Sequence, residues 1–170
     1  PLSAGVHDEY VEAKESPHHI KYLNDDAHDI TQETFGFLIF QEQIALLAHK
    51  LGGLTLDEGN MLRKVLTKKG TGKGSVKGKL HDKFILGCAA NKIGKDEAQA
   101  LWDKFEYFSG YGFNKSHAVS YSIISFQCAW LWNYYPAEWM AAFLDKEPES
   151  RKEKAINIAK KFGFEIAPLV

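Results

Sequence analysis

The stretch FEYFSGYGFNKSHAVSYSIISFQCAWLWNYY, residues 105–135, decides the fold class of this chain. It opens with a short loop in which Gly110 and Gly112 allow backbone angles that other residues resist. About five turns of almost unbroken apolar and aromatic residues follow, and they end at Pro136, which a helix interior does not tolerate. We therefore predict a long helix, and a helix that is apolar all round is usually buried. The side chains expected to pack inward are Val119, Ile123, Phe126 and Trp130.

Three polar residues lie where the loop meets this helix: Lys115, His117 and Tyr121. His117 and Tyr121 are four positions apart, so they share one helix face. The N-terminus of a helix carries unpaired N–H groups and partial positive charge, which suits a bound anion. A cation, an imidazole and an aromatic ring at this end could hold a phosphate and stack a base. From the residues alone, a structural His–Tyr pair explains the pattern equally well.

Helical patterns also cover most of the remaining chain. A capping box of Thr55 and Glu58 starts one helix, and Gly52–Gly53 ends the amphipathic helix before it. Apolar runs without helical spacing occur at residues 36–40 and 164–167, which we predict to be short and extended. The fold class predicted is mainly α, with one or two short strands near the two ends. The helices expected cover residues 6–14, 41–50, 56–69, 76–93, 95–108, 137–146 and 149–161.

Cationic side chains gather in two further places. Arg63 and Lys64 are adjacent, and Lys68 follows on the same predicted helix, which could equally be a solubilising surface. Residues 68–83 then hold six lysines and four glycines. They do not form a P-loop, because Thr67 stands where the first glycine would be required. We interpret them as a basic loop that neutralises phosphates, with a mobile solvent loop as the alternative. The predicted DNA contacts are Lys69, Lys73, Lys77 and Lys79.

Composition limits the class of protein. A chain of 170 residues with 45% hydrophobic residues can build one domain with a real core. The net charge of −1 carries no global nucleic-acid signature. Cys88 and Cys128 are isolated, which predicts a reducing, cytoplasmic location and no zinc ribbon. Five polar side chains interrupt residues 118–135, so we expect no membrane span. The absence of an initiator Met suggests a fragment or a processed product.

The order of residues in three segments resembles one protein family. GYGFNKSHAVSY (residues 110–121), followed by SFQCAWLWNYYPAEWMAAFL (residues 125–144), resembles the fingers region of C-family replicative DNA polymerases, the polymerase III alpha subunit of bacteria and its bacteriophage relatives. ETFGFLIFQEQIALLAHKLGG (residues 33–53) is similar to the family's passage from palm to fingers. The resemblance therefore implies a leading segment at residues 1–40 and a helical fingers domain at residues 41–170.

The resemblance also implies a function for the cationic residues. In the family, a helix with consecutive basic residues, usually two arginines, approaches the incoming nucleoside triphosphate. Arg63 and Lys64 occupy those positions, and a lysine in second place supplies a point charge without a bidentate fork. The chain would thus be the fingers segment of a replicative DNA-directed DNA polymerase, a nucleotidyltransferase. The implied nucleotide-binding residues are Arg63, Lys64, Lys68, Lys115, His117 and Tyr121.

Catalysis by two metal ions needs carboxylates fixed on rigid strands, and the predicted strand at residues 36–40 contains none. The family's catalytic aspartates belong to a palm domain, so we expect no catalytic residue here and no activity of this segment alone. Mg²⁺ would be bound in the complete polymerase and not by this chain. The implied partners are primer–template DNA, deoxynucleoside triphosphates, the palm and thumb, and the sliding clamp with other replisome subunits. Two alternatives stay open: a non-catalytic helical DNA-binding module that uses residues 68–83, and a scaffold.

Overall fold

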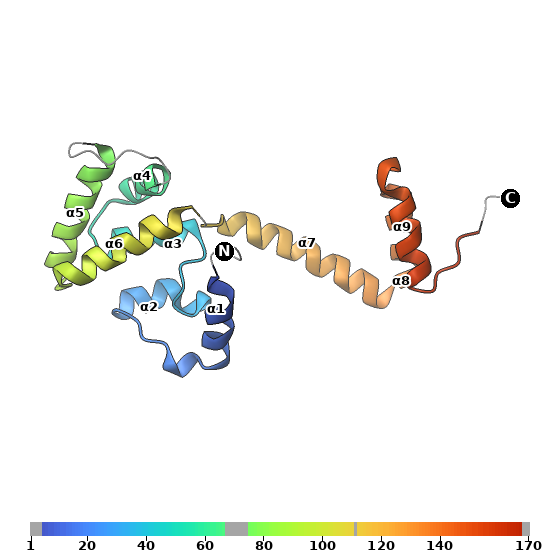
Figure 1. Cartoon of the computed structure of the whole chain (residues 1–170), viewed down its shortest axis with the longest axis horizontal. Helices are drawn as coiled ribbons and strands as arrows, with labels where there is room; N and C mark the ends of the chain where they lie inside the picture. Colours follow the sequence, from blue (N-terminus) through green and yellow to red (C-terminus); the bar gives the residue numbers. More distant parts are fainter. Residues whose placement is uncertain (1–4, 67–74, 111, 168–170) are drawn as a thin grey trace. The chain divides into compact units, whose positions relative to one another are not determined.

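The computed structural model describes residues 5–66, 75–110 and 112–167 of the chain. These residues are mainly helical, as predicted (Figure 1). They divide into two compact units, residues 1–116 and 117–170, which are treated separately below. The predicted division between residues 40 and 41 stays a prediction. The α-helices are α1 (Val6–Glu15), α2 (Asp25–Thr31), α3 (Gln41–Lys50), α4 (Leu56–Leu66), α5 (Val76–Ala90), α6 (Lys95–Ser109), α7 (Lys115–Tyr134), α8 (Pro136–Lys146) and α9 (Glu149–Lys161), with short 3₁₀ turns at Pro17–His19 and Gln32–Thr34.

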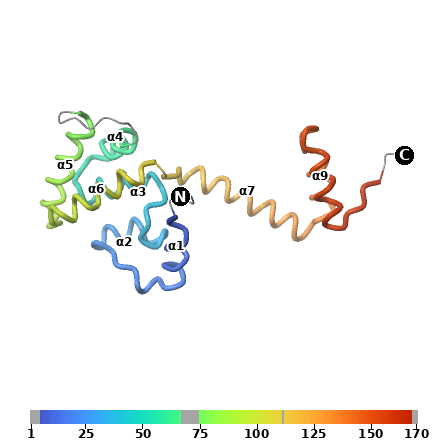
Figure 2. The backbone as a smooth tube through the Cα atoms, viewed as in Figure 1, coloured from blue at the N-terminus to red at the C-terminus, as the bar shows by residue number. Residues whose placement is uncertain are grey.

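The first unit is built around the packing of α3, α4, α5 and α6, which lie side by side in Figure 2. Their apolar stripes meet in one core because each helix repeats its large side chains every three or four positions. Gly59 lets α4 approach α3 closely, since a Cβ at this position would lie 2.7 Å from the Ala45 carbonyl oxygen. The largest fully buried side chains are Phe84, Phe105, Ile44, Leu51, Leu54 and Leu62.

The predicted strand at residues 36–40 does not form, and the described residues contain no strand elsewhere, including residues 164–167. A single parallel bridge joins Phe40 to Phe113. A longer ladder is prevented because the Gln43 side chain accepts the N–H groups of Ile39 and Phe40, each at 2.9 Å. Leu38 of this run packs against the hydrophobic core. A strand needs a continuous ladder of backbone partners, and this segment has one bridge only.

The second unit contains most of α7, together with α8 and α9. Helices α8 and α9 pack on each other, with Met140, Ala155 and Ala159 buried. The Lys152 ammonium donates to the Leu144 carbonyl oxygen at 2.8 Å, which satisfies an acceptor at the end of α8. Trp132 of α7 makes an edge contact with Phe162, with ring centroids 5.0 Å apart.

The prediction that the α7 side chains pack inward is wrong for the chain as described. None of the α7 residues is buried, and Val119, Ile123, Phe126 and Trp130 are between 44% and 69% exposed. Burial of a helix that is apolar all round requires neighbours on every side, and within the second unit α8 and α9 pack mainly on each other. Within the described ranges, α7 included, no helix has both the length and the apolar content needed to cross a membrane.

Candidate functional site

Arg63 and Lys64 lie near the end of α4, which begins with the predicted capping box. The Thr55 N–H donates to Glu58 Oε2 at 2.7 Å, and the Glu58 N–H donates to Thr55 Oγ1 at 3.2 Å. A hydrogen bond from Lys83 is the largest cause that lowers the pKa of the Glu58 carboxyl. Because Lys83 belongs to α5, this contact also joins the start of α4 to its neighbour. Arg63 is thus carried by a helix that is fixed at its beginning.

The segment before α7 is bound to the start of α3. The Phe113 N–H donates to the Ile39 carbonyl at 3.1 Å, and the Gln41 N–H donates to the Phe113 carbonyl at 3.0 Å. Gly112 permits this approach, because a Cβ there would lie 2.8 Å from Gln41 Cγ. The first residues of α7 are therefore positioned by α3 and not by their own loop alone.

Glu42, in the first turn of α3, joins three groups through one carboxylate. Its Oε1 accepts from Asn114 Nδ2 at 3.1 Å and lies 3.7 Å from Arg63 Nη1. Its Oε2 accepts from the backbone N–H of Lys115 at 3.1 Å. The guanidinium of α4 and the first N–H of α7 therefore lie around one anion. This arrangement combines charge with a helix N-terminus, both of which favour oxyanions.

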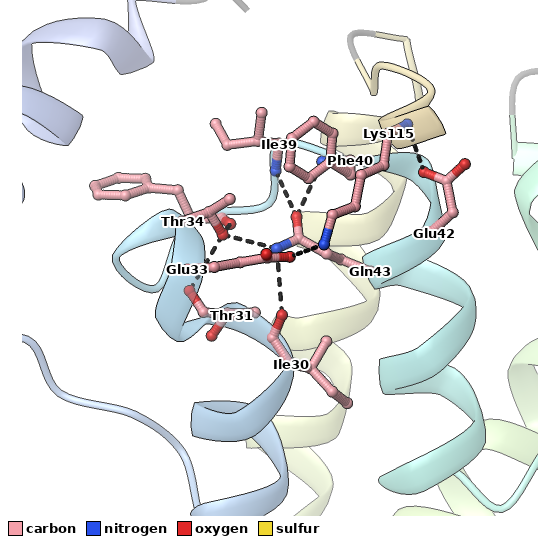
Figure 3. A network of polar contacts seen from close by, with 10 residues as sticks. Ile30, Thr31, Glu33, Thr34, Ile39, Phe40, Glu42, Gln43 and Lys115 are labelled. Atoms are coloured by element: carbon pink, nitrogen blue, oxygen red, sulfur yellow. Dashed lines mark hydrogen bonds and ion pairs between the residues drawn. The ribbon is translucent and has the colours of Figure 1, made fainter. Parts of the chain in front are cut away.

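The Lys115 side chain extends past the Phe40 ring to the Glu33 carboxylate (Figure 3). Its ammonium forms an ion pair with Glu33 and lies 5.7 Å from the centroid of the Phe40 ring. Lys115 thus provides the predicted positive charge at the start of α7, but its ammonium contacts a carboxylate of the chain. Sequence reasoning missed Glu33, because a contact across 82 positions leaves no local pattern.

A buried glutamine, Gln43, fixes the segment that precedes α3. Gln43 is 2% exposed, so its side chain does not lie on the helix surface. Its Nε2 donates to Thr34 Oγ1 at 2.7 Å and to the Ile30 carbonyl at 3.3 Å, while Oε1 accepts the two backbone N–H groups described above (Figure 3). All its polar atoms are therefore used to hold the segment between α2 and α3.

His117 and Tyr121 lie on α7 in the second unit. Their ring centroids are 4.4 Å apart with the planes inclined by 48°, which confirms that they share one helix face. Tyr121 is exposed, so its ring can be reached by a planar ligand. Their joint use with Arg63 and Lys64 for one nucleotide stays a prediction.

The predicted DNA-contacting lysines fall into two groups. Lys69 and Lys73 lie outside the described residues, as does Lys68, which is predicted to bind nucleotide. Lys77 and Lys79 belong to α5, so the second half of the predicted basic loop is helical. Lys79 is exposed, whereas the Lys77 side chain is only 12% exposed and its ammonium lies 2.8 Å from Glu106 Oε1. A DNA contact by Lys77 would require this ion pair to break.

The Lys77–Glu106 pair predicts how the stability of the first unit depends on pH. Burial raises the pKa of the Glu106 carboxyl, but hydrogen bonds from Lys77 and Trp102 outweigh it and leave the pKa below its ordinary value. The stabilisation is therefore complete above the unfolded pKa of about 4.3 and is lost as the pH falls through the lower folded value. We expect Glu106→Gln to reduce the free energy of unfolding by about 1 kcal/mol at pH 7, since the pair is partly exposed.

Urea unfolding at pH 7 and at about pH 3 checks this expectation, because protonated glutamic acid and glutamine differ little in charge. The deficit of Glu106→Gln should shrink as the pH falls through the folded pKa of the Glu106 carboxyl. Glu12→Gln, at an exposed position of α1, serves as the control. An equal deficit at both pH values would contradict an ionic origin.

Comparison with known proteins defines the class. Residues 1–92 match the family model described as the bacterial DNA polymerase III alpha subunit finger domain, which is more than half of the chain. The chain therefore belongs to this family, and the resemblance noted in residues 33–53 and 110–144 is confirmed.

Individual relatives extend the match over nearly the whole chain. The DNA polymerase III subunit alpha of Aquifex aeolicus is 36% identical over 169 residues, which are 99% of this chain and 14% of the relative. The same subunit of Campylobacter jejuni is 35% identical over 170 residues, and that of Escherichia coli strain K12 is 32% identical over 176 residues. This chain spans about one seventh of the length of these relatives.

Proposed function

We propose that this chain acts within a longer replicative DNA polymerase as the part of the fingers that binds the incoming deoxynucleoside triphosphate. The observation that carries the proposal is the cluster around Glu42, where Arg63 of α4 and the first N–H of α7 lie on one carboxylate. A guanidinium and a helix N-terminus are the groups that proteins use to bind phosphate. The family membership of the chain supports the same assignment.

Each predicted residue would have a separate task. Arg63 would hold phosphate oxygens with its planar fork, and Lys64 and Lys115 would add point charges. Lys68 would contribute similarly, although it lies outside the described residues. The exposed Tyr121 ring, with His117 against it, would lie on the base or sugar of the nascent pair. A flat ring accepts every base, so selectivity would come from pairing with the template.

The chemical step itself would take place on another domain. Among the described residues, no group of three or more His, Cys, Asp or Glu side chains could hold a metal ion. In the proposal, Mg²⁺ and the catalytic carboxylates belong to the palm of the complete enzyme, and this chain contributes orientation and charge neutralisation. The alternative of a DNA-binding module that uses residues 68–83 stays a hypothesis, since 67–74 lie outside the described residues.

Steady-state kinetics of the full-length polymerase test the role of Arg63. We expect Arg63→Ala to raise the KM for the incoming nucleotide about 10-fold or more, since hydrogen bonds to charged groups are worth about 1.5–3 kcal/mol. Arg151→Ala is the matched control, because Arg151 pairs with Glu147 on the surface of the second unit. An unchanged KM for nucleotide in Arg63→Ala would remove Arg63 from the site.

A further inference from the structure

The Lys115 ammonium, to which the proposed function assigns a contact with the triphosphate, is held by an acidic side chain of the same unit. The Lys115 ammonium contacts the Glu33 carboxylate and lies over the Phe40 ring. Both charged side chains are well exposed, Lys115 at 40% and Glu33 at 48%. Water therefore reaches the pair, and its two charges can separate without leaving either one buried.

Other electropositive groups of the candidate site also contact carboxylates of the chain. The Arg63 guanidinium and the first N–H of α7 both lie on Glu42. These two groups and the Lys115 ammonium thus each face a carboxylate oxygen of the chain, and groups of this kind also bind phosphate oxygens. A carboxylate carries one negative charge, whereas a triphosphate carries several and accepts more hydrogen bonds.

We propose that Glu33 is an internal counter-anion, which holds Lys115 until the triphosphate of an incoming nucleotide displaces it. Glu33 thereby sets the apparent affinity for nucleotide without touching it, an inference that rests on the proposed function. Binding exchanges one ion pair for another. The free energy needed to separate Lys115 from Glu33 therefore offsets part of the attraction between Lys115 and the phosphates.

Glu33 is better suited to this exchange than Glu42. Among the described residues, Lys115 is the polar partner of the Glu33 side chain, so removal of that carboxylate charge leaves the backbone contacts intact. Glu42 also accepts from Asn114 and from the N–H of Lys115, which hold the start of α7. Glu42 therefore has a structural task, and Glu33 is the residue whose substitution isolates the ionic effect.

The experiment is a double-mutant cycle in the full-length polymerase. We expect Glu33→Gln to lower the KM for nucleotide about two- to five-fold, the range that an exposed ion pair contributes. Lys115→Met should raise the KM, and Glu33→Gln added to Lys115→Met should change nothing further. Glu15→Gln, which removes an exposed carboxylate from α1, controls for a general loss of negative charge and should leave the KM unchanged.

Three outcomes would overturn the proposal, and they are distinguishable. If Lys115→Met leaves the KM unchanged, the assignment of Lys115 under the proposed function fails together with the inference. If Lys115→Met raises the KM but Glu33→Gln does not lower it, only the inference fails. If Glu33→Gln lowers the KM equally with and without Lys115, the substitution acts by removing negative charge near the site and not by releasing Lys115.

Discussion

Replacement of Gly87 by alanine should destabilise the first unit by about 3 kcal/mol, at the upper end of the usual cost of overpacking. Gly87 lies in α5, where a Cβ would stand 1.8 Å from the Gly52 carbonyl oxygen and 2.4 Å from its carbonyl carbon. Both are backbone atoms just after α3, so no side chain can rotate away to relieve the clash. In an ordinary helix interior, the same substitution stabilises by roughly 0.5–1 kcal/mol.

Urea unfolding of the 170-residue chain, followed by far-ultraviolet circular dichroism, measures this change. Gly110→Ala is the control, because nothing described lies within 4 Å of a Cβ added at that position. Its effect should stay within about 0.5 kcal/mol. If Gly87→Ala unfolds at the same urea concentration as the parent chain, the close approach of α5 to the end of α3 is refuted.

Gln43→Leu should cost about 3 kcal/mol, because it keeps the approximate volume of the side chain but removes every polar contact. The N–H groups of Ile39 and Phe40 would lose their acceptor, and the Ile30 carbonyl would lose a donor. Each buried backbone group that stays unsatisfied costs about 1–3 kcal/mol. The segment between α2 and α3 should loosen as a result.

Two measurements check the Gln43 prediction. Denaturant unfolding gives the loss of stability, and hydrogen–deuterium exchange at the amides of Ile39 and Phe40 reports on the segment itself. Gln32→Leu makes the same chemical change at an exposed position and should alter stability by less than about 0.5 kcal/mol. Unchanged protection of the two amides in Gln43→Leu would show that another group holds them.

Local signals predicted most of the helices well. The amphipathic period and the glycines after it predicted α3 at residues 41–50, which is the observed range. Thr55 with Glu58 and Pro136 correctly marked the beginnings of α4 and α8. These signals work because a capping hydrogen bond or a proline ring acts within three or four positions.

Two predictions based on hydrophobicity alone were wrong. Residues 36–40 are apolar but form no strand, and α7 is apolar but has no buried residue. Hydrophobicity indicates that a side chain prefers a covered position, but it does not specify which neighbour covers it. Strand formation and burial both depend on partners distant in the chain, so a short window could not predict them.

The sequence by itself determined the family, the helical class and the identity of the candidate cations Arg63, Lys64 and Lys115. These properties depend on the order of residues along the chain. Only the tertiary structure decided the state of those cations. It paired Lys115 with Glu33, 82 positions away, and brought Arg63 to Glu42, so that each of these two cations lies against a carboxylate of the chain. The physical reason is that Coulombic attraction acts between atoms that are close in space, whatever their separation along the chain.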